Sequence, residues 1–170
     1  MSEARRVQTL LGGLFVLTAA VAVSVGIWLR LTHPTTAPPP VIPPVINLYV
    51  PRVDEKGELH YDSKPFSTAQ QPDAYHAVFE QLLRETPIFP EGTRLLDAER
   101  QDDMLVLNFS AELVKNFEGG SDTEAALINA LTRTASGFPG VQKVQILIEG
   151  KRVETLGGHL DISQPLPVQP

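Results

Sequence analysis

The amino-acid sequence predicts an α+β two-layer sandwich, in which two helices cover one face of a mixed sheet. Amphipathic patterns near residues 73–84 and 121–136 supply the helices. Segments of alternating apolar and polar residues, joined by tight turns, supply the strands, and the clearest of them lies in Phe138–Asp161. The expected order is β-α-β-β-α-β-β, preceded by one transmembrane helix.

The first strand is expected at Val45–Val50, with Pro51 ending it. The polar stretch 54–71 is then expected either to cross the surface or to form a short extra hairpin. The first helix covers Asp73 to about Arg84, because its apolar residues recur at helical spacing, and the segment 87–92 breaks it. The apolar face of this helix consists of Tyr75, Val78, Phe79, Leu82 and Leu83.

A central hairpin follows, with strands at Thr93–Glu99 and Met104–Phe109 and a polar turn at 100–103. The next segment, 110–120, is a loop with room for one helical turn. These features place two antiparallel strands between the helices.

The second helix is expected to begin at a capping box formed by Ser121 and Glu124. Gly137 is expected to end it in the left-handed conformation. Its buried stripe consists of Ala125, Ile128, Leu131 and Ala135.

The run Phe138–Asp161 begins with a Pro-Gly break and predicts a half-buried hairpin that closes the domain. Its first strand places Val144, Ile146 and Ile148 on one face, and Lys143, Gln145 and Glu149 on the other. A turn at 149–151, a second short strand and the pair Gly157-Gly158 follow, and 165–170 is expected to be a loose tail.

The N-terminal segment 7–29 carries no charge and is long enough for a helix of about 34 Å, which spans a bilayer core. A cleaved signal peptide is the alternative, but its apolar region is usually only about 7–15 residues, and Trp28–His33 is not a cleavage site of small residues. Arg5 and Arg6 before the span favour a cytoplasmic N-terminus and a domain outside the cytoplasm. The expected organisation is a cytoplasmic segment 1–6, an anchor 7–29, a Pro-rich linker 30–44, a domain 45–164 and a tail 165–170.

The composition limits the possible partners. The linker contains Pro34, Pro38–Pro40, Pro43 and Pro44, and such a segment acts as a semi-rigid polyproline spacer. From Val45 onward the chain has 11 Lys and Arg residues against 19 Asp and Glu residues, a formal charge of −8. This charge argues against nucleic acid and against anionic lipid headgroups as partners of the domain. The chain has no cysteine, which is compatible with an oxidising exterior.

Candidate chemistry is limited to His159, with Asp161 two residues later and Glu154 five residues earlier. In a strand His159 and Asp161 would share a face, but two ligands are too few for a zinc site, so we interpret His159 as hydrogen-bonded to nearby backbone. Gly157-Gly158 is interpreted as a pair that permits positive φ or a close backbone approach. Nucleophile, phosphate-binding and calcium-loop motifs are absent from the sequence. We therefore predict no catalytic, cofactor-binding or metal site and no cofactor.

Four segments resemble the GerMN domain family, which is named for a spore-germination protein: Phe89–Thr93, Leu107–Ser110, Gly119–Ser121 and Phe138–Asp161. The resemblance covers roughly 45–164. Two loops depart from the family pattern, since the connection at 83–87 is short and Asp102-Asp103 replaces a turn glycine. The resemblance implies a membrane-tethered or lipoprotein-like exterior module, associated in spore formers with envelope morphogenesis and germination, and it transfers no catalytic residues.

Two functions are therefore weighed. The favoured one is a membrane-anchored binding or scaffold module that contacts an envelope protein or peptidoglycan through a sheet edge or open face. The alternative is a hydrolase of the wall or of a small substrate that uses His159, Asp161 and Glu154. We favour the first because the sequence shows no convergent set of catalytic residues.

Overall fold

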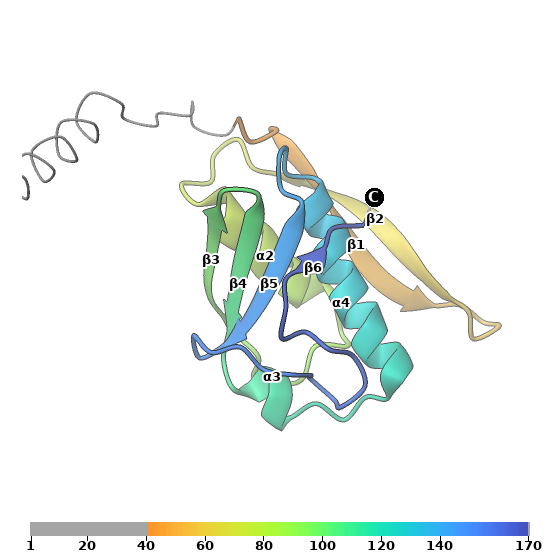
Figure 1. The fold of residues 1–170 in the computed structure, drawn as a ribbon. Helices are drawn as coiled ribbons and strands as arrows, with labels where there is room; N and C mark the ends of the chain where they lie inside the picture. Colours follow the sequence, from red (N-terminus) through yellow and green to blue (C-terminus); the bar gives the residue numbers. More distant parts are fainter. Residues whose placement is uncertain (1–40, 170) are drawn as a thin grey trace, which may run out of the picture. The chain divides into compact units, whose positions relative to one another are not determined.

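The computed structural model describes residues 41–169 (Figure 1). The strands are β1 (Val45–Val53), β2 (Leu59–Ser67), β3 (Leu95–Gln101), β4 (Met104–Phe109), β5 (Lys143–Ile148) and β6 (Leu166–Pro167), and the helices are α2 (Ala74–Glu85), α3 (Glu112–Lys115) and α4 (Ser121–Ser136). The predicted span 7–29 and the linker up to residue 40 lie outside the described residues. Among residues 41–169, no helix is both long and apolar enough to cross a bilayer.

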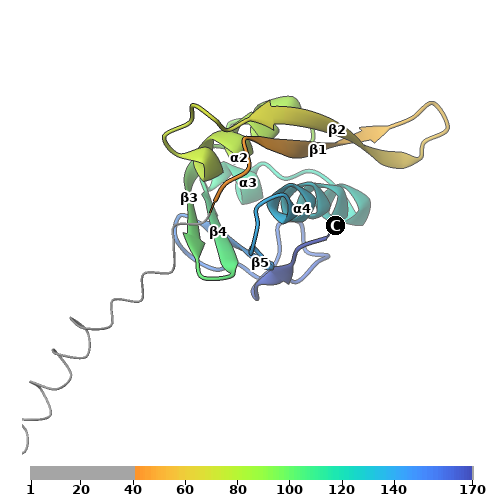
Figure 2. The same ribbon diagram turned by 90° about the horizontal axis from the view of Figure 1, so that it is seen from above.

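The described domain has an α+β fold with two sheets. The larger sheet has the order β3-β4-β5-β6 and is mixed, because β4 and β5 are parallel and the other pairs are antiparallel. The smaller sheet is the hairpin β1-β2, and helices α2 and α4 lie between the two sheets (Figure 2). The expected two-layer arrangement is therefore wrong, because the first strand pairs with β2 on the far side of the helices instead of joining the mixed sheet. The expected element order also lacks β2 and the short helix α3, and it places the last strand before residue 161 instead of at β6.

Pro51 does not end the first strand, which continues to Val53. The backbone N–H of Thr68 donates to Pro44 O (2.9 Å), and this bond fixes the alternation of the β1-β2 ladder. In that alternation the odd-numbered residues of both strands point their N–H groups away from the partner strand. The N–H group that Pro51 lacks would have pointed away from β2. The proline therefore removes no hydrogen bond from the β1-β2 ladder. The polar stretch after it does form the extra hairpin strand, but β2 is nine residues long.

The hairpin is held on the helices by apolar and polar contacts. Ile46, Leu48 and Val50 are buried in the core beneath β1. Thr134 of α4 accepts the N–H of Tyr49 at its hydroxyl (3.1 Å). From β2, Lys64 forms an ion pair with Glu85 at the end of α2 (Nζ–Oε2 2.6 Å), and the Tyr61 ring lies 4.8 Å from the Arg133 guanidinium carbon of α4. Contacts on both helices therefore fix the position of the hairpin.

The first helix and the central hairpin match the sequence prediction closely. Asp73 caps α2 by accepting the N–H of His76 (3.0 Å), and Val78, Phe79 and Leu82 are buried. The strands β3 and β4 meet at the expected polar turn, where Asp102 adopts a positive φ of 55°. The short helix α3 is the single helical turn that the loop had room for. Local periodicity was sufficient for these elements.

The second helix spans the expected residues, with Gly137 at its C-terminus, but both of its expected capping geometries are wrong. Gly120 is the N-cap of α4, so Ser121 lies inside the helix and the side chain of Glu124 is buried instead of reaching back to Ser121. Gly137 has right-handed dihedral angles (φ −67°, ψ −15°). A Cβ at Gly137 would lie 3.3 Å from Ile46 Cγ2, so the glycine serves close packing of β1 against the helix end. The positive φ expected at Gly137 is found at Gly140 (78°).

The strand β5 confirms the predicted buried face, on which Val144, Ile146 and Ile148 lie. Gln145, expected on the polar face, is only 2% exposed. Its Nε2 donates to Ile146 O (3.0 Å) and Ile162 O (3.4 Å), because the following segment packs along β5.

The predicted second strand of the closing hairpin does not form. The pairing after the turn is reduced to one bridge between Ile148 and Lys151. The edge of β5 is covered instead by the irregular segment 152–163, which buries Leu156 and Ile162. Beyond it, β6 pairs with the start of β5, and Val168 donates its N–H to Gln142 O (2.9 Å). The residues expected to form a loose tail are therefore attached to the sheet as far as Val168.

Candidate functional site

A buried carboxylate joins α4 to the C-terminal loop at the sequence-predicted histidine. Glu124, in the first turn of α4, is fully buried. Its Oε1 accepts the backbone N–H groups of Leu156 (2.8 Å) and Gly157 (3.0 Å). Its Oε2 accepts the N–H of His159 (3.0 Å) and lies 3.2 Å from His159 Nδ1. We refer to Glu124 with these three loop residues as the Glu124 clamp.

The clamp holds Glu124 in its ionised form. Burial by itself raises the pKa of this carboxyl group, but the N–H groups of Gly157, Leu156 and His159 and the imidazole lower it. Together the hydrogen bonds outweigh the burial, so the pKa lies below its ordinary value. Because the buried carboxylate accepts three backbone N–H groups of the loop, it attaches the loop to α4.

Asp161 and Glu154 do not join this cluster. Asp161 Oδ1 accepts the N–H of Ser163 (2.9 Å), and the hydrogen bonds of Ser163, the side-chain one first, lower the Asp161 pKa. The backbone oxygen of Glu154 accepts the N–H of Ile162 (2.8 Å). Since no strand forms here, the expected shared face of His159 and Asp161 does not exist. Within 41–169, no group of three or more His, Asp or Glu side chains is arranged to hold a metal ion.

The interpretation of His159 as hydrogen-bonded to nearby backbone is wrong, because its Nδ1 lies beside the Glu124 carboxylate. Sequence reasoning missed this partner because the two residues are 35 positions apart. One sequence signal did exist. Glu124 continues the apolar stripe of α4 at helical spacing before Leu127, Ile128 and Leu131, so a buried carboxylate could have been suspected.

The paired glycines have separate structural reasons. A Cβ at Gly157 would lie 2.4 Å from Phe117 Cε1, so only glycine lets the clamp loop approach Phe117. Gly158 has a φ of 90° and open space around it. Gly157 therefore permits a close approach of the backbone to Phe117, and Gly158 permits a positive φ.

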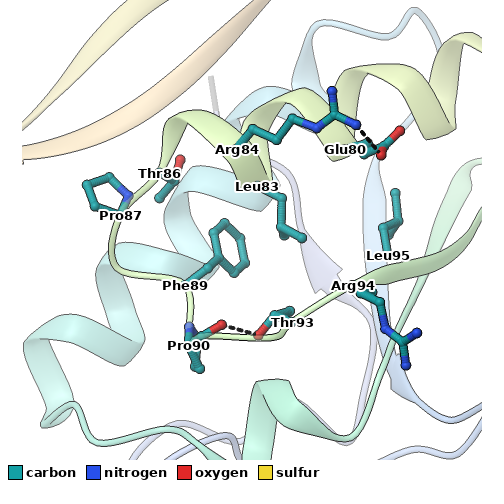
Figure 3. Close-up of a pocket in the computed structure, with 10 residues that line it drawn as sticks. All are labelled: Glu80, Leu83, Arg84, Thr86, Pro87, Phe89, Pro90, Thr93, Arg94 and Leu95. Atoms are coloured by element: carbon teal, nitrogen blue, oxygen red, sulfur yellow. Dashed lines mark hydrogen bonds and ion pairs between the residues drawn. The ribbon is translucent and has the colours of Figure 1, made fainter.

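A surface groove lies between the C-terminal half of α2 and the segment that leads into β3 (Figure 3). Its volume is about 510 Å³, within the range of about 300–1,000 Å³ that is typical of ligand sites. Leu83 and Phe89 point toward one another across it in Figure 3, and Leu95 adds to the apolar lining. We call this feature the α2–β3 groove. Its lining residues are Glu80, Leu83, Arg84, Thr86, Pro87, Phe89, Pro90, Thr93, Arg94 and Leu95.

The charges of the groove differ from those of the domain as a whole. Arg84 forms an ion pair with Glu80 one turn earlier on α2 (2.6 Å). Arg94 is exposed and forms no ion pair with any residue in 41–169. The groove therefore carries a formal charge of +1 on a domain whose net charge is −8. The groove is therefore suited to a ligand that has an apolar group with a negative charge beside it.

A second hollow of about 460 Å³ lies next to the groove and shares Pro90 with it. It is more polar, with Lys115, Asn116 and Glu118 in its lining, and Asn116 Nδ2 donates to Glu91 O (2.9 Å). Sequence reasoning missed both hollows. Residues 80–95 alone line the α2–β3 groove, but they carry no motif that marks a site, and the second hollow joins residues 88–91 to residues 115–123.

The family model Germane, described as sporulation and spore germination, matches residues 47–154, which is more than half of the chain. The chain belongs to the Germane family. The resemblance to GerMN domains inferred from sequence motifs is thereby confirmed. The match contains the whole α2–β3 groove but ends at Glu154, so the loop residues of the Glu124 clamp lie beyond it.

Solved structures support the Germane fold. The first GerMN domain of the sporulation protein GerM from Bacillus subtilis is 17% identical, with a TM-score of 0.55 over 72% of this chain and 96% of that one. The tandem GerMN domains of the same protein are 16% identical, with a TM-score of 0.50 over 74% of this chain and 45% of that one. No curated protein matches the chain significantly.

Proposed function

We propose that this Germane protein is a non-catalytic binding module of the bacterial cell envelope, with its domain outside the cytoplasm. The apolar segment 7–29 would anchor it, and the Pro-rich segment 30–44 would hold the domain away from the bilayer. The family description and the similar fold of a sporulation protein support a role in the envelope. Its partner would be another envelope protein or peptidoglycan.

The observation that carries this proposal is the α2–β3 groove. It combines an apolar lining with a few charged groups at the rim, which is the usual composition of a binding site. The groove lies on secondary structure that the core holds in place, since Leu82 of α2 and Leu95 of β3 are both buried. A preformed site of this kind loses little entropy when a partner binds.

The free edges of the two sheets are less suitable binding sites than the groove. Pro65 lies at an odd position of β2, so the free edge of that strand lacks one of its N–H donors. At the outer edge of β3 the N–H of Ala98 is already bonded to Asp97 Oδ1 (2.9 Å). Both features oppose the addition of a further strand.

The hydrolase alternative receives no support from the clamp geometry. His159 and Glu124 resemble a base with its orienting carboxylate, but a nucleophile would also be needed beside the imidazole. In the described part of the chain, the hydrogen bonds of the imidazole go to Glu124 and none go to a Ser or Thr hydroxyl. Glu124 also bonds the loop backbone, which accounts for its burial without a catalytic role.

Photocrosslinking in intact envelopes tests the proposal. A photoreactive residue in place of Pro87, an exposed and uncharged residue of the groove lining, should give a discrete adduct with an envelope protein or with wall fragments that a muramidase releases. The same residue in place of Arg152, which is exposed and outside the groove, is the matched control. Equal labelling from both positions, or none from position 87, would contradict the proposal.

A further inference from the structure

The far end of the β1-β2 hairpin exposes an apolar pair. Val53 and Leu59 are opposite each other in the register, and their exposed fractions are 68% and 44%. Figures 1 and 2 show this end of the hairpin extending beyond the helices. We refer to residues 53–59 as the hairpin tip. Its apolar side chains are available to another molecule.

The hairpin tip has a defined conformation. Asp54 Oδ1 accepts the N–H groups of Lys56 and Glu58, both at 2.8 Å. Asp54 also pairs with Glu58 through the backbone (N–O 3.0 Å), and Gly57 supplies the positive φ of 82° that the turn requires. The turn therefore presents a fixed apolar pair surrounded by Asp54, Glu55 and Glu58, against the single positive charge of Lys56.

The hairpin tip and the α2–β3 groove are complementary. The tip offers two exposed apolar side chains and a formal charge of −2, whereas the groove offers an apolar lining and a formal charge of +1. Opposite charges around an apolar contact favour encounter and fix its orientation. Within one chain the tip side chains are exposed, so they do not fill the groove of their own domain.

We propose that the hairpin tip of one copy docks into the α2–β3 groove of a second copy, so that this Germane protein associates head to tail. This inference rests on the proposed binding function and names the partner of the same groove. Each copy uses a different surface on its two sides, so a pair of copies still has one free tip and one free groove. Such a contact builds rings or open chains of copies along a membrane surface.

The contact is small and should be weak in dilute solution. Anchoring confines the copies to one surface and raises their effective concentration, which compensates for the low affinity. The experiment therefore uses the full chain reconstituted in vesicles of neutral lipid.

The chain has no cysteine, so single engineered thiols report one contact at a time. Chains with Lys56→Cys in the tip are mixed with chains carrying Pro87→Cys in the groove, and a short thiol crosslinker is added. The matched control partner carries Arg152→Cys, which is exposed and outside the groove. We expect the tip–groove adduct to exceed the control adduct by about tenfold, since specific docking requires one orientation. Equal yields from the two mixtures would overturn the inference.

Charge reversal gives a second criterion. Glu55→Lys with Glu58→Lys in the tip chain should lower the tip–groove adduct by about tenfold, because like charges then meet. Arg84→Glu with Arg94→Glu in the groove chain should lower it similarly, and combining the two reversed chains should restore it. Arg152→Glu should leave the yield unchanged. Yields that do not respond to any reversal would overturn the inference.

The two proposals fail differently. If the photoreactive residue at position 87 captures another envelope component and no tip–groove adduct forms, self-association is wrong and the binding function stands. If position 87 captures nothing and no tip–groove adduct forms, both are wrong.

Discussion

At the scale of single residues, Glu124 decides how the C-terminal loop is attached. It is fully buried and accepts three backbone N–H groups, which are all aimed at an anion. The stabilisation is charge-assisted, and such hydrogen bonds are each worth roughly 1.5–3 kcal/mol. Removing the charge without changing the shape is therefore the sharpest perturbation of the clamp.

We expect Glu124→Gln to lower the free energy of unfolding by about 2–3 kcal/mol. The NH2 group of the glutamine side chain would face backbone N–H groups of the loop, and two donors cannot form a hydrogen bond. Urea unfolding of the full chain measures this loss. Glu154→Gln is the control, because Glu154 is exposed and its hydrogen bond with Ile162 uses the backbone oxygen. This substitution should change the free energy of unfolding little. Equal effects of the two substitutions would show that the clamp is not what stabilises the loop.

The same residue predicts a dependence on pH. Because the folded state holds the Glu124 pKa below its ordinary value of 4.5, the clamp contributes its full stability above about pH 4.5. That contribution is lost as the pH falls through the lower pKa of the folded state. The difference between the wild type and Glu124→Gln should therefore shrink from pH 7 to pH 3. A difference in unfolding free energy that is constant over this range would contradict an ionised Glu124.

Gly157 gives a further test at the residue scale. Gly157→Ala forces Cβ to within 2.4 Å of Phe117 Cε1 and should cost about 1–3 kcal/mol of stability. Phe117→Leu removes the ring and should recover part of that loss when the two substitutions are combined. Strictly additive losses in this double-mutant cycle would mean that the steric explanation is wrong.

At the scale of elements, what could be predicted from sequence depended on how local the cause was. The helix α2 and the strand β4 follow from periodicity and from neighbouring turn residues, so their positions were predicted nearly to the residue. The loss of the second strand after β5 depends instead on packing of the segment 152–163 along the sheet. The capping-box motif at Ser121 failed because burial of Glu124 competes with capping. Tertiary contacts prevailed at both places.

The strand β6 shows how the C-terminal residues contribute. Leu166 packs against the core from a two-residue strand, and Val168 adds a backbone hydrogen bond to Gln142 (2.9 Å). A chain that ends at Gln164 should therefore lose about 2 kcal/mol of stability, because it lacks two partly buried apolar side chains, Leu166 and Val168, and a few hydrogen bonds. A chain that ends at Val168 is the control. If both truncated chains unfold at the urea concentration of the wild type, β6 contributes nothing.

At the scale of the whole molecule, the sequence indicated the family and the α+β class, but the candidate site was only partly accessible. His159 was identified, whereas its carboxylate partner lies on another element. The α2–β3 groove involves ordinary apolar residues and two arginines, with no spacing that marks them as a site. The apolar pair of the hairpin tip exists only because β2 pairs with β1, a pairing that the polar composition of β2 did not specify. Functional surfaces of this kind depend on tertiary structure.

A salt series distinguishes the electrostatic and the apolar contributions to the proposed tip–groove contact. Between exposed charges, the Debye length falls from about 10 Å at 0.1 M to 3 Å at 1 M, so charge reversal should affect the adduct yield strongly at low salt and weakly at high salt. Val53→Ser with Leu59→Ser removes the apolar pair and should lower the yield at every salt concentration, because apolar burial is not screened. Crosslinking of reconstituted full chains across a salt series measures both effects. If the serine variant behaves as the wild type while charge reversal abolishes the adduct, the contact is purely electrostatic and the apolar pair does not enter the groove.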